Sequence, residues 1–178
     1  MKNILALSGS IRQASTSERI LRFIDHRYHD QLAVERYDLS QLPYFNADIE
    51  APPVVADFLH KITQADGVIV CTPEYVFSLP GVLKNALEWT VATTVFLEKP
   101  VALITAAASG QHAHESLALM MRTFGAAFDE QASLLIRGAK SKLTRQGDIV
   151  DEAILQGLDT LITSLQATLA NRHVTTNS

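Results

Sequence analysis

The sequence predicts an α/β protein in which a doubly wound, five-stranded parallel sheet carries helices on both of its faces. Two observations point to this class. Short, continuously apolar runs recur along the chain, as expected for parallel strands that are covered on both sides. Each run is followed by a segment with the i, i+3, i+4 apolar spacing of a helix. Repeated strand–helix alternation of this kind requires right-handed crossovers and a single parallel sheet.

Five strands are expected along the chain. The apolar runs at residues 4–7, 67–72 and 101–106 are typical of buried strands. Residues 32–39 mix apolar with charged side chains, which favours a strand nearer the edge of the sheet. A fifth strand is expected at about residues 131–137, before the last helical stretch.

Five amphipathic stretches predict the helices. Their apolar faces consist of Ile20, Leu21 and Ile24; Val55, Phe58, Leu59 and Ile62; Val82, Leu83, Ala86 and Leu87; Leu117, Met120, Met121 and Phe124; and Ile154, Leu155, Leu158, Leu161, Ile162, Leu165 and Leu169. A length of 178 residues suits one domain, which we place at residues 1–170. Residues 171–178 are polar without apolar periodicity, and a mobile C-terminal tail is expected there.

Composition narrows the classes of partner. The 15 Lys and Arg residues against 19 Asp and Glu residues give a net charge of −4, which argues against nucleic-acid binding. No stretch approaches the roughly 20 apolar residues of a membrane span. The only cysteine, Cys71, cannot form an intrachain disulfide, and the first apolar run is too short for a secretory signal. A cytoplasmic protein is expected.

Ligands of such sheets bind beyond the carboxyl ends of the strands, so the loops there are the candidate site. The first loop, residues 8–17, holds several hydroxyl groups and Arg12 just before a helix. Ser10, Ser15 and Ser17 can donate hydrogen bonds to a phosphate at the helix N-terminus, where Arg12 can neutralise its charge. The alternative is that Ser15 and Glu18 form an ordinary capping box. Neither GxxxxGK[ST] nor GxGxxG occurs, which favours a single phosphate without a metal.

Two further loops complete the candidate site. In residues 72–81, two prolines bracket Tyr75 and Phe77, and a stiff backbone with aromatic surface suits a flat ring. The alternative is a turn whose aromatic side chains pack on the adjoining helix. In residues 105–115, small residues let a ligand approach the backbone. His112, His114 and Glu115 could suggest a metal, but side chains two positions apart on a helix point to different faces, so no metal site is predicted.

The motifs in these loops resemble those of the NADPH-dependent FMN reductase family, a flavodoxin-like group that includes quinone, chromate and azo-dye reductases. The family pattern G-S-x-R-x-x-S-x-N is matched by Gly9, Ser10, Arg12 and Ser15, with Ser17 in place of the asparagine. The longer pattern P-E-Y-N-x-S-x-P-G-x-L-K-N-A is matched across residues 73–86, except that Val76 replaces the asparagine. The third loop lacks the family's G-G-x-R.

The resemblance implies that FMN and NADPH are the cofactors and that the flavin itself, rather than a catalytic side chain, takes the hydride. The residues that it assigns to cofactor binding are Ser8, Ser10, Arg12, Ser15, Thr16 and Ser17 around the phosphate; Pro73, Glu74, Tyr75, Val76 and Ser78 along the isoalloxazine; and Ala108, Ser109 and Gly110 at its far side.

The expected activity is an FMN-dependent NAD(P)H oxidoreductase that passes electrons from NADPH to a small acceptor by a ping-pong mechanism. The acceptor could be a quinone, a free flavin, an azo dye or a metal oxyanion. The alternative is a flavodoxin-type electron carrier or a flavin-dependent sensor that binds a protein partner. The basic group Arg12, Arg19 and Arg22, which can attract NADPH phosphates, favours the enzyme.

The segment after the second loop predicts self-association. A helix at residues 79–89 is apolar on one side, and Trp89 and the apolar run 91–97 follow it. One sheet face cannot easily cover all of this surface, and uncovered apolar patches usually mark interfaces. The resemblance points the same way, so a homodimer or homotetramer is expected. The alternative is that Trp89 and Phe96 belong to the core.

Overall fold

The computed structural model describes residues 1–144 and 149–175, and it contains one five-stranded sheet in which all paired strands are parallel. The strand order is β2-β1-β3-β4-β5. The strands are β1 (Lys2–Ser8), β2 (Leu32–Tyr37), β3 (Gly67–Thr72), β4 (Val101–Ala107) and β5 (Ser133–Arg137). This confirms the predicted parallel sheet, and the flavodoxin-like fold with it.

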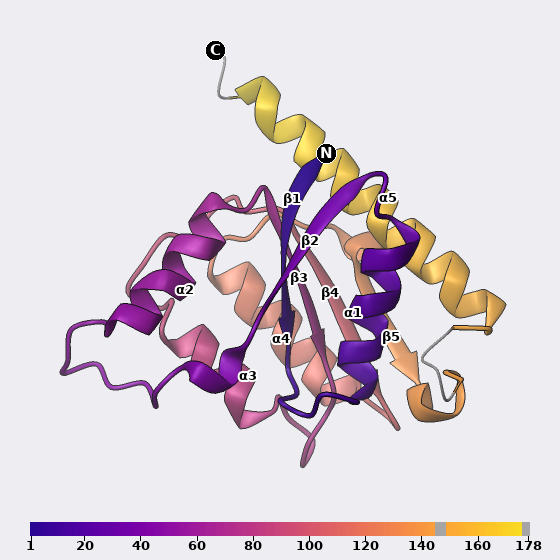
Figure 1. Ribbon diagram of the computed structural model, residues 1–178, viewed down its shortest axis with the longest axis horizontal. Coiled ribbons are helices and arrows are strands. Elements are labelled where there is room, and N and C mark those ends of the chain that lie inside the picture. Colours follow the sequence, from indigo (N-terminus) through magenta and orange to yellow (C-terminus); the bar gives the residue numbers. More distant parts are fainter. Residues whose placement is uncertain (145–148, 176–178) are drawn as a thin grey trace.

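Helices cover both faces of the sheet, with α1 and α5 on one side and α2, α3 and α4 on the other (Figure 1). Their bounds are α1 (Thr16–Arg27), α2 (Pro53–Gln64), α3 (Gly81–Glu88), α4 (Gln111–Thr123) and α5 (Glu152–Thr175). Short 3₁₀ turns occur at η1 (Leu39–Gln41), η2 (Glu130–Ala132) and η3 (Ala139–Ser141). None of the helices in the described ranges has the length and apolar character needed to cross a bilayer.

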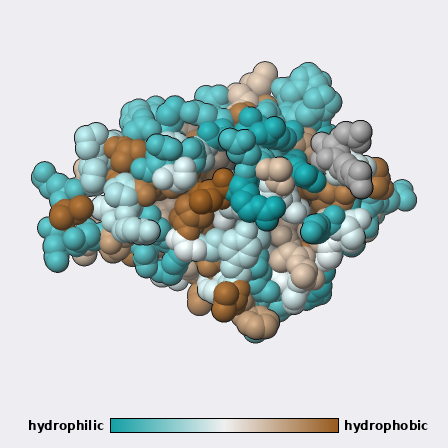
Figure 2. Space-filling view, turned by 60° about the horizontal axis from the view of Figure 1, so that its bottom comes forward, coloured by the Kyte–Doolittle hydropathy of each residue, from teal (hydrophilic) through white to brown (hydrophobic). Residues whose placement is uncertain are grey.

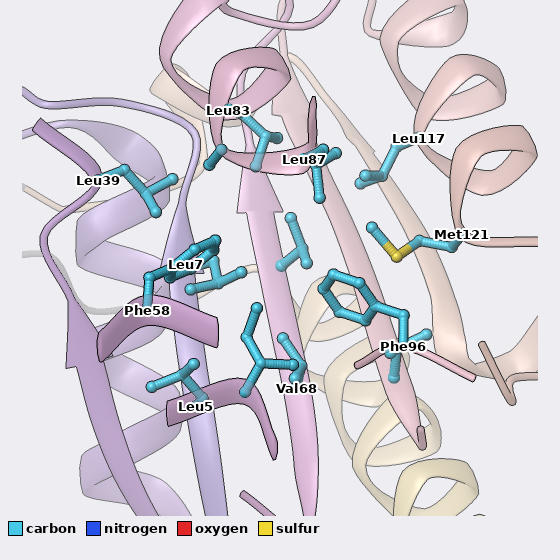
Figure 3. Close-up of a cluster of buried hydrophobic side chains, with 14 of the residues drawn as sticks. Leu5, Leu7, Leu39, Phe58, Val68, Leu83, Leu87, Phe96, Leu117 and Met121 are labelled. Carbon is cyan, nitrogen blue, oxygen red and sulfur yellow. The ribbon is translucent and has the colours of Figure 1, made fainter. Parts of the chain in front are cut away.

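Each central strand contributes to two hydrophobic cores, which explains the continuously apolar run at residues 4–7 of β1 and the mostly apolar sequences of β3 and β4. Leu5 and Leu7 of β1 point toward α2, α3 and α4, whereas Ile4 and Ala6 belong to the core under α1 and α5. Successive side chains of a strand alternate between faces, so a strand covered on both sides has apolar side chains at most positions. Figure 3 shows the first core, where Phe58 and Leu83 pack over the β1 and β3 side chains.

Trp89 and Phe96 are part of this core, so the expectation that they form a surface patch was wrong. Trp89 is 6% exposed; its indole N–H donates to the carbonyl of Pro43 at 2.9 Å, and its ring meets Phe45 edge-on. Phe96 is 2% exposed, stacks on Phe124, and lies among the core side chains in Figure 3. Val91 and Leu97, which are more than half exposed, remain at the surface of this segment.

Some boundaries differ from those expected. β2 ends at Tyr37 because Asp38 caps the 3₁₀ turn η1, its side chain accepting from the Ser40 N–H. α3 begins at Gly81 because Leu79 precedes a proline, and residues before proline avoid helical angles. α5 runs to Thr175, beyond the domain end expected at residue 170. Residues 176–178 of the expected tail lie outside the described residues.

Candidate functional site

The three loops meet at the carboxyl edge of the sheet around a hollow of about 190 Å³. Its lining comes from loop one and the start of α1 (Ser10, Arg12, Ser15, Thr16 and Ser17), from loop two (Pro73, Glu74 and Tyr75) and from the end of β4 (Ala106, Ala107 and Ala108). The strand arrows of Figure 1 end on this edge, and Figure 2 turns it toward the viewer, where apolar patches lie among hydrophilic residues.

Ser15 caps the N-terminus of α1, as the capping-box alternative proposed. Its hydroxyl oxygen accepts the N–H of Glu18 at 3.1 Å, while its own N–H donates to the carbonyl of Arg12. The Glu18 carboxylate forms ion pairs with Arg22 and Arg36 instead, so the box is half formed. The Ser15 hydroxyl proton is still a donor, so its capping role and phosphate binding are compatible.

Ser17 supplies the clearest sign of a missing partner. Its side chain is buried, at 1% exposure, and its hydroxyl oxygen has no hydrogen-bond partner of standard geometry in the described part of the chain. It neighbours the Cys71 thiol, a weak hydrogen-bonding group whose pKa it lowers against the larger effect of burial. A buried, unpaired hydroxyl costs free energy, so native proteins rarely keep one unless a ligand or water pairs with it. Ser17 lies in the first turn of α1 and lines the hollow with Ser10 and Arg12, which makes its hydroxyl a candidate donor to an anion at the helix N-terminus.

Loop one is held tightly against β3. The N–H of Gly9 donates to the carbonyl of Cys71 at 2.8 Å, and a Cβ on Gly9 would lie 2.2 Å from the Thr72 hydroxyl. Only glycine fits this close approach. The Ser8 hydroxyl donates to the Ser10 carbonyl and accepts the Ser10 N–H, which fixes the loop's course into α1. Burial raises the pKa of the Cys71 thiol below this loop to about 12, so Cys71 is not a candidate nucleophile.

Glu74 joins loops two and three. Its two carboxylate oxygens accept the N–H groups of Gly110 and Ala113, each at 3.0 Å, at the N-terminus of α4. The N–H of Ala113 is the main cause of a lowered pKa for Glu74, with that of Gly110 adding to it. The carboxylate therefore fixes the separation between the two walls of the hollow, a role that the sequence analysis did not foresee.

Residues 75–78 form a tight two-residue turn. The N–H and carbonyl groups of Tyr75 and Ser78 are joined by two hydrogen bonds of 3.0 Å. The central residues, Val76 and Phe77, have φ angles of +51° and +56°, a region that β-branched and bulky side chains rarely adopt. Val76 is 95% exposed, and Phe77, 74% exposed, meets the His112 ring edge-on. The alternative proposed for this loop, aromatic side chains packed on the adjoining helix, is not what the structure shows: Phe77 meets α4 rather than α3 and stays largely exposed.

The His114 ring is held between two neighbouring hydroxyl groups of the fold. Its ring nitrogens lie 3.0 Å from the Thr105 hydroxyl and 3.1 Å from that of Ser133, and burial is the main cause of a lowered pKa. Within residues 1–144 and 149–175, no group of three or more His, Cys, Asp or Glu side chains is arranged to hold a metal ion.

The structure thus gathers most, but not all, of the expected site residues around one hollow. Ser8, Val76, Ser78, Ser109 and Gly110 lie outside its lining: they shape loop one, form the turn or lead into α4. Ala106 and Ala107 line it and were missed. Their signal was the run of small residues at the carboxyl end of a buried strand.

Comparison with curated proteins identifies relatives along most of the chain. It is 34% identical over 165 residues to the NADH:(hydroxy)cinnamate reductase subunit CrdA of Vibrio ruber, covering 88% of this chain and 82% of that protein. It is 33% identical over 178 residues to an NADPH:quinone oxidoreductase of Arabidopsis thaliana, covering 92% and 90%.

Among solved structures, the flavoenzyme NAD(P)H:(acceptor) oxidoreductase FerB from Paracoccus denitrificans has a TM-score of 0.80 at 22% identity, with 96% of each chain covered, and it shares the fold. The model of one family, described as NADPH-dependent FMN reductase, matches residues 2–139. This match spans the sheet and all three loops of the hollow. The chain belongs to the NADPH-dependent FMN reductase family.

Proposed function

We propose that this protein is an FMN-dependent NAD(P)H oxidoreductase that reduces a small organic acceptor. The observation that carries the proposal is the cluster of hydroxyl groups at the N-terminus of α1, the buried Ser17 hydroxyl among them, in a hollow that Arg12 also lines. When bound, FMN accepts a hydride from the nicotinamide and passes two electrons to the acceptor. The protein's role is to bind the flavin, to orient it toward the nicotinamide and to shield it from water.

The phosphate of FMN fits the start of α1. Ser10, Ser15 and Ser17 offer hydroxyl donors, the first-turn N–H groups of α1 offer backbone donors, and Arg12 supplies a positive charge. Thr16 lines the same wall. An anion here is further stabilised by the positive end of the helix dipole.

The ring of FMN fits between loops two and three. Pro73 stiffens one wall, and the small side chains of Ala106, Ala107 and Ala108 let a flat ring approach the backbone of the other. Glu74, by bonding to the start of α4, keeps these walls at a fixed separation. No described side chain in the hollow needs to act as an acid or base.

The acceptor is proposed to be a small aromatic or quinonoid molecule. Two relatives are named for a hydroxycinnamate and a quinone, Tyr75 lines the hollow with an exposed aromatic ring, and exposed Phe77 lies two residues further along the same turn. The proposal also includes free flavins, azo dyes and metal oxyanions as acceptors. An electron carrier would instead need a protein partner and would not turn over NAD(P)H by itself.

We also propose that the protein works as a homodimer or homotetramer in the cytoplasm. Exposed Val91 and Leu97, in the segment between α3 and β4, support self-association, and the single, buried cysteine suits a reducing compartment. Light scattering at micromolar concentration is expected to return at least a dimer, and a monomer would contradict the proposal. Trp89 is not a suitable interface probe because it is core.

Flavin titration tests the assignment of the hollow. FMN is expected to bind much more tightly than riboflavin, which lacks the phosphate. Arg12→Ala is expected to weaken FMN binding by about ten-fold to a hundred-fold, the value of one charge-assisted contact, and to leave riboflavin binding unchanged. Equal affinity of the wild type for the two flavins would refute this assignment.

A further inference from the structure

A second hollow, of about 320 Å³, lies beside the cofactor site on the β2 side of loop one. Three arginines from separate elements line it: Arg12 from loop one, Arg22 from α1 and Arg36 from β2. The lining also holds two carboxylates, Glu18 and Asp38. The three guanidinium groups outnumber the two carboxylates in this hollow, whereas the whole chain has a net charge of −4.

The arginines are held in place but keep unused donors. Glu18 Oε1 pairs with Nε of Arg22 at 3.0 Å and with Nε of Arg36 at 3.4 Å, so one carboxylate fixes two guanidinium groups. Nη1 of Arg36 also pairs with Asp25 at 3.2 Å. A guanidinium group has five N–H donors, so these ion pairs leave four on Arg22 and three on Arg36.

The Asp38 carboxylate is hydrogen-bonded within the turn that it caps, η1. Its Oδ1 accepts the N–H and hydroxyl of Ser40 at 3.0 and 2.7 Å, and its Oδ2 accepts the Gln41 amide at 3.2 Å. Hydrogen bonds from Ser40 keep the Asp38 pKa low. The carboxylate is thus stabilised within the turn instead of pairing with the three arginines of the hollow.

The position of this hollow relates it to the flavin site. Arg12 and Ser10 line both hollows, so the two adjoin along loop one. In the sheet order, β2 lies two strands from β3, which is about 10 Å across the carboxyl edge. A dinucleotide whose nicotinamide lies at loops two and three can span this distance. Exposed Ile11 and half-buried Tyr37 add apolar surface for an adenine.

We propose that this hollow binds the adenosine 2′-phosphate of NADPH, and that Arg22 and Arg36 are the residues that favour NADPH over NADH. The inference rests on the proposed function and goes beyond it by assigning nucleotide specificity, on which the names of the relatives differ. A phosphate dianion can take several charge-assisted hydrogen bonds from the free guanidinium donors, whereas the 2′-hydroxyl of NADH cannot.

Steady-state kinetics of the FMN-loaded enzyme test the assignment. The double variant Arg22→Gln, Arg36→Gln is expected to raise the KM for NADPH about tenfold and to leave the KM for NADH and the affinity for FMN within about twofold of the wild type. Arg19→Gln is the control for charge: it removes one positive charge from α1, where the double variant removes one from α1 and one from β2. Although the sequence analysis grouped Arg19 with Arg12 and Arg22, Arg19 lies outside the lining of both hollows. An equal rise in KM for NADPH in Arg19→Gln would indicate a general field effect and overturn the proposal.

Direct titration provides a readout that does not depend on turnover. Adenosine 2′,5′-bisphosphate is expected to bind the wild type at least about tenfold more tightly than adenosine 5′-monophosphate, and the double variant is expected to lose this difference. Equal binding of the two nucleotides by the wild type, or an unchanged ratio in the double variant, would overturn the proposal. If the wild type does not bind FMN, the proposed function itself is refuted.

Discussion

The turn at residues 75–78 stores backbone strain beside the flavin site, and replacing Val76 with asparagine is expected to release it. Val76 has φ +51°, in the left-handed region. An L-residue pays roughly 1–2 kcal/mol there, and β-branched side chains are among the least suited. Asparagine adopts this region several times more readily than most residues.

The structure allows the size of the effect to be worked out. Since Val76 is 95% exposed, its side chain contributes almost none of the roughly 1.5–3 kcal/mol that full burial would give, so little is lost on its removal. Val76→Asn should therefore raise the free energy of unfolding by about 1 kcal/mol. For a chain of this length, the midpoint of thermal unfolding should rise by about 2–4 °C.

Thermal and urea unfolding of the FMN-free protein measure this gain. Val150→Asn is the matched control: Val150 is also exposed, at 70%, but it is not among the described residues with positive φ. Its stability should stay within about 0.5 kcal/mol of the wild type. If Val76→Asn is no more stable than Val150→Asn, the argument from backbone strain is refuted.

Three further results are expected. Gly9→Ala should lower the free energy of unfolding by about 1–3 kcal/mol and weaken FMN binding, because the new Cβ meets Thr72. Gly81→Ala is the control, since nothing lies within 4 Å of its new Cβ, and it should lose neither. Equal losses of stability in urea unfolding would contradict this. Glu74 has a native pKa below its usual 4.5, so the stability that it contributes is present above that pH and is lost as the pH falls. The stability difference between wild type and Glu74→Gln should therefore shrink from pH 6 to pH 3, and a constant difference would count against the role of Glu74. Initial rates at varied NADPH and quinone should give parallel lines, since one hollow serves both substrates in turn, and intersecting lines would require a ternary complex.

Much of the fold could be predicted from the sequence because its signals are local. A strand covered on both faces is apolar at most positions, and residues 67–72 and 101–106, each with one threonine, show this directly. The sequence also indicates loop one as a candidate phosphate site, since hydroxyl groups and Arg12 precede a helix at the end of the first strand, and the structure brings these residues to one hollow.

The remaining features depend on contacts between distant residues. Trp89 is buried because its indole finds the carbonyl of Pro43, 46 positions earlier, and no periodicity reveals that partner. Glu74 belongs to a family motif, yet its bonds to the start of α4 follow from the β3–β4 pairing. Arg36 and Arg22 share the Glu18 carboxylate because β2 lies beside β1. The order of elements along the chain does not show that these two strands are neighbours.

The most direct test of the account is anaerobic reduction of the FMN-loaded protein. NADPH added in slight excess is expected to bleach the visible absorption of the bound flavin within one turnover, and a quinone added afterwards is expected to restore it without a partner protein. A protein that binds FMN but keeps its colour with both NADPH and NADH would contradict the assignment as an NAD(P)H oxidoreductase and favour an electron carrier.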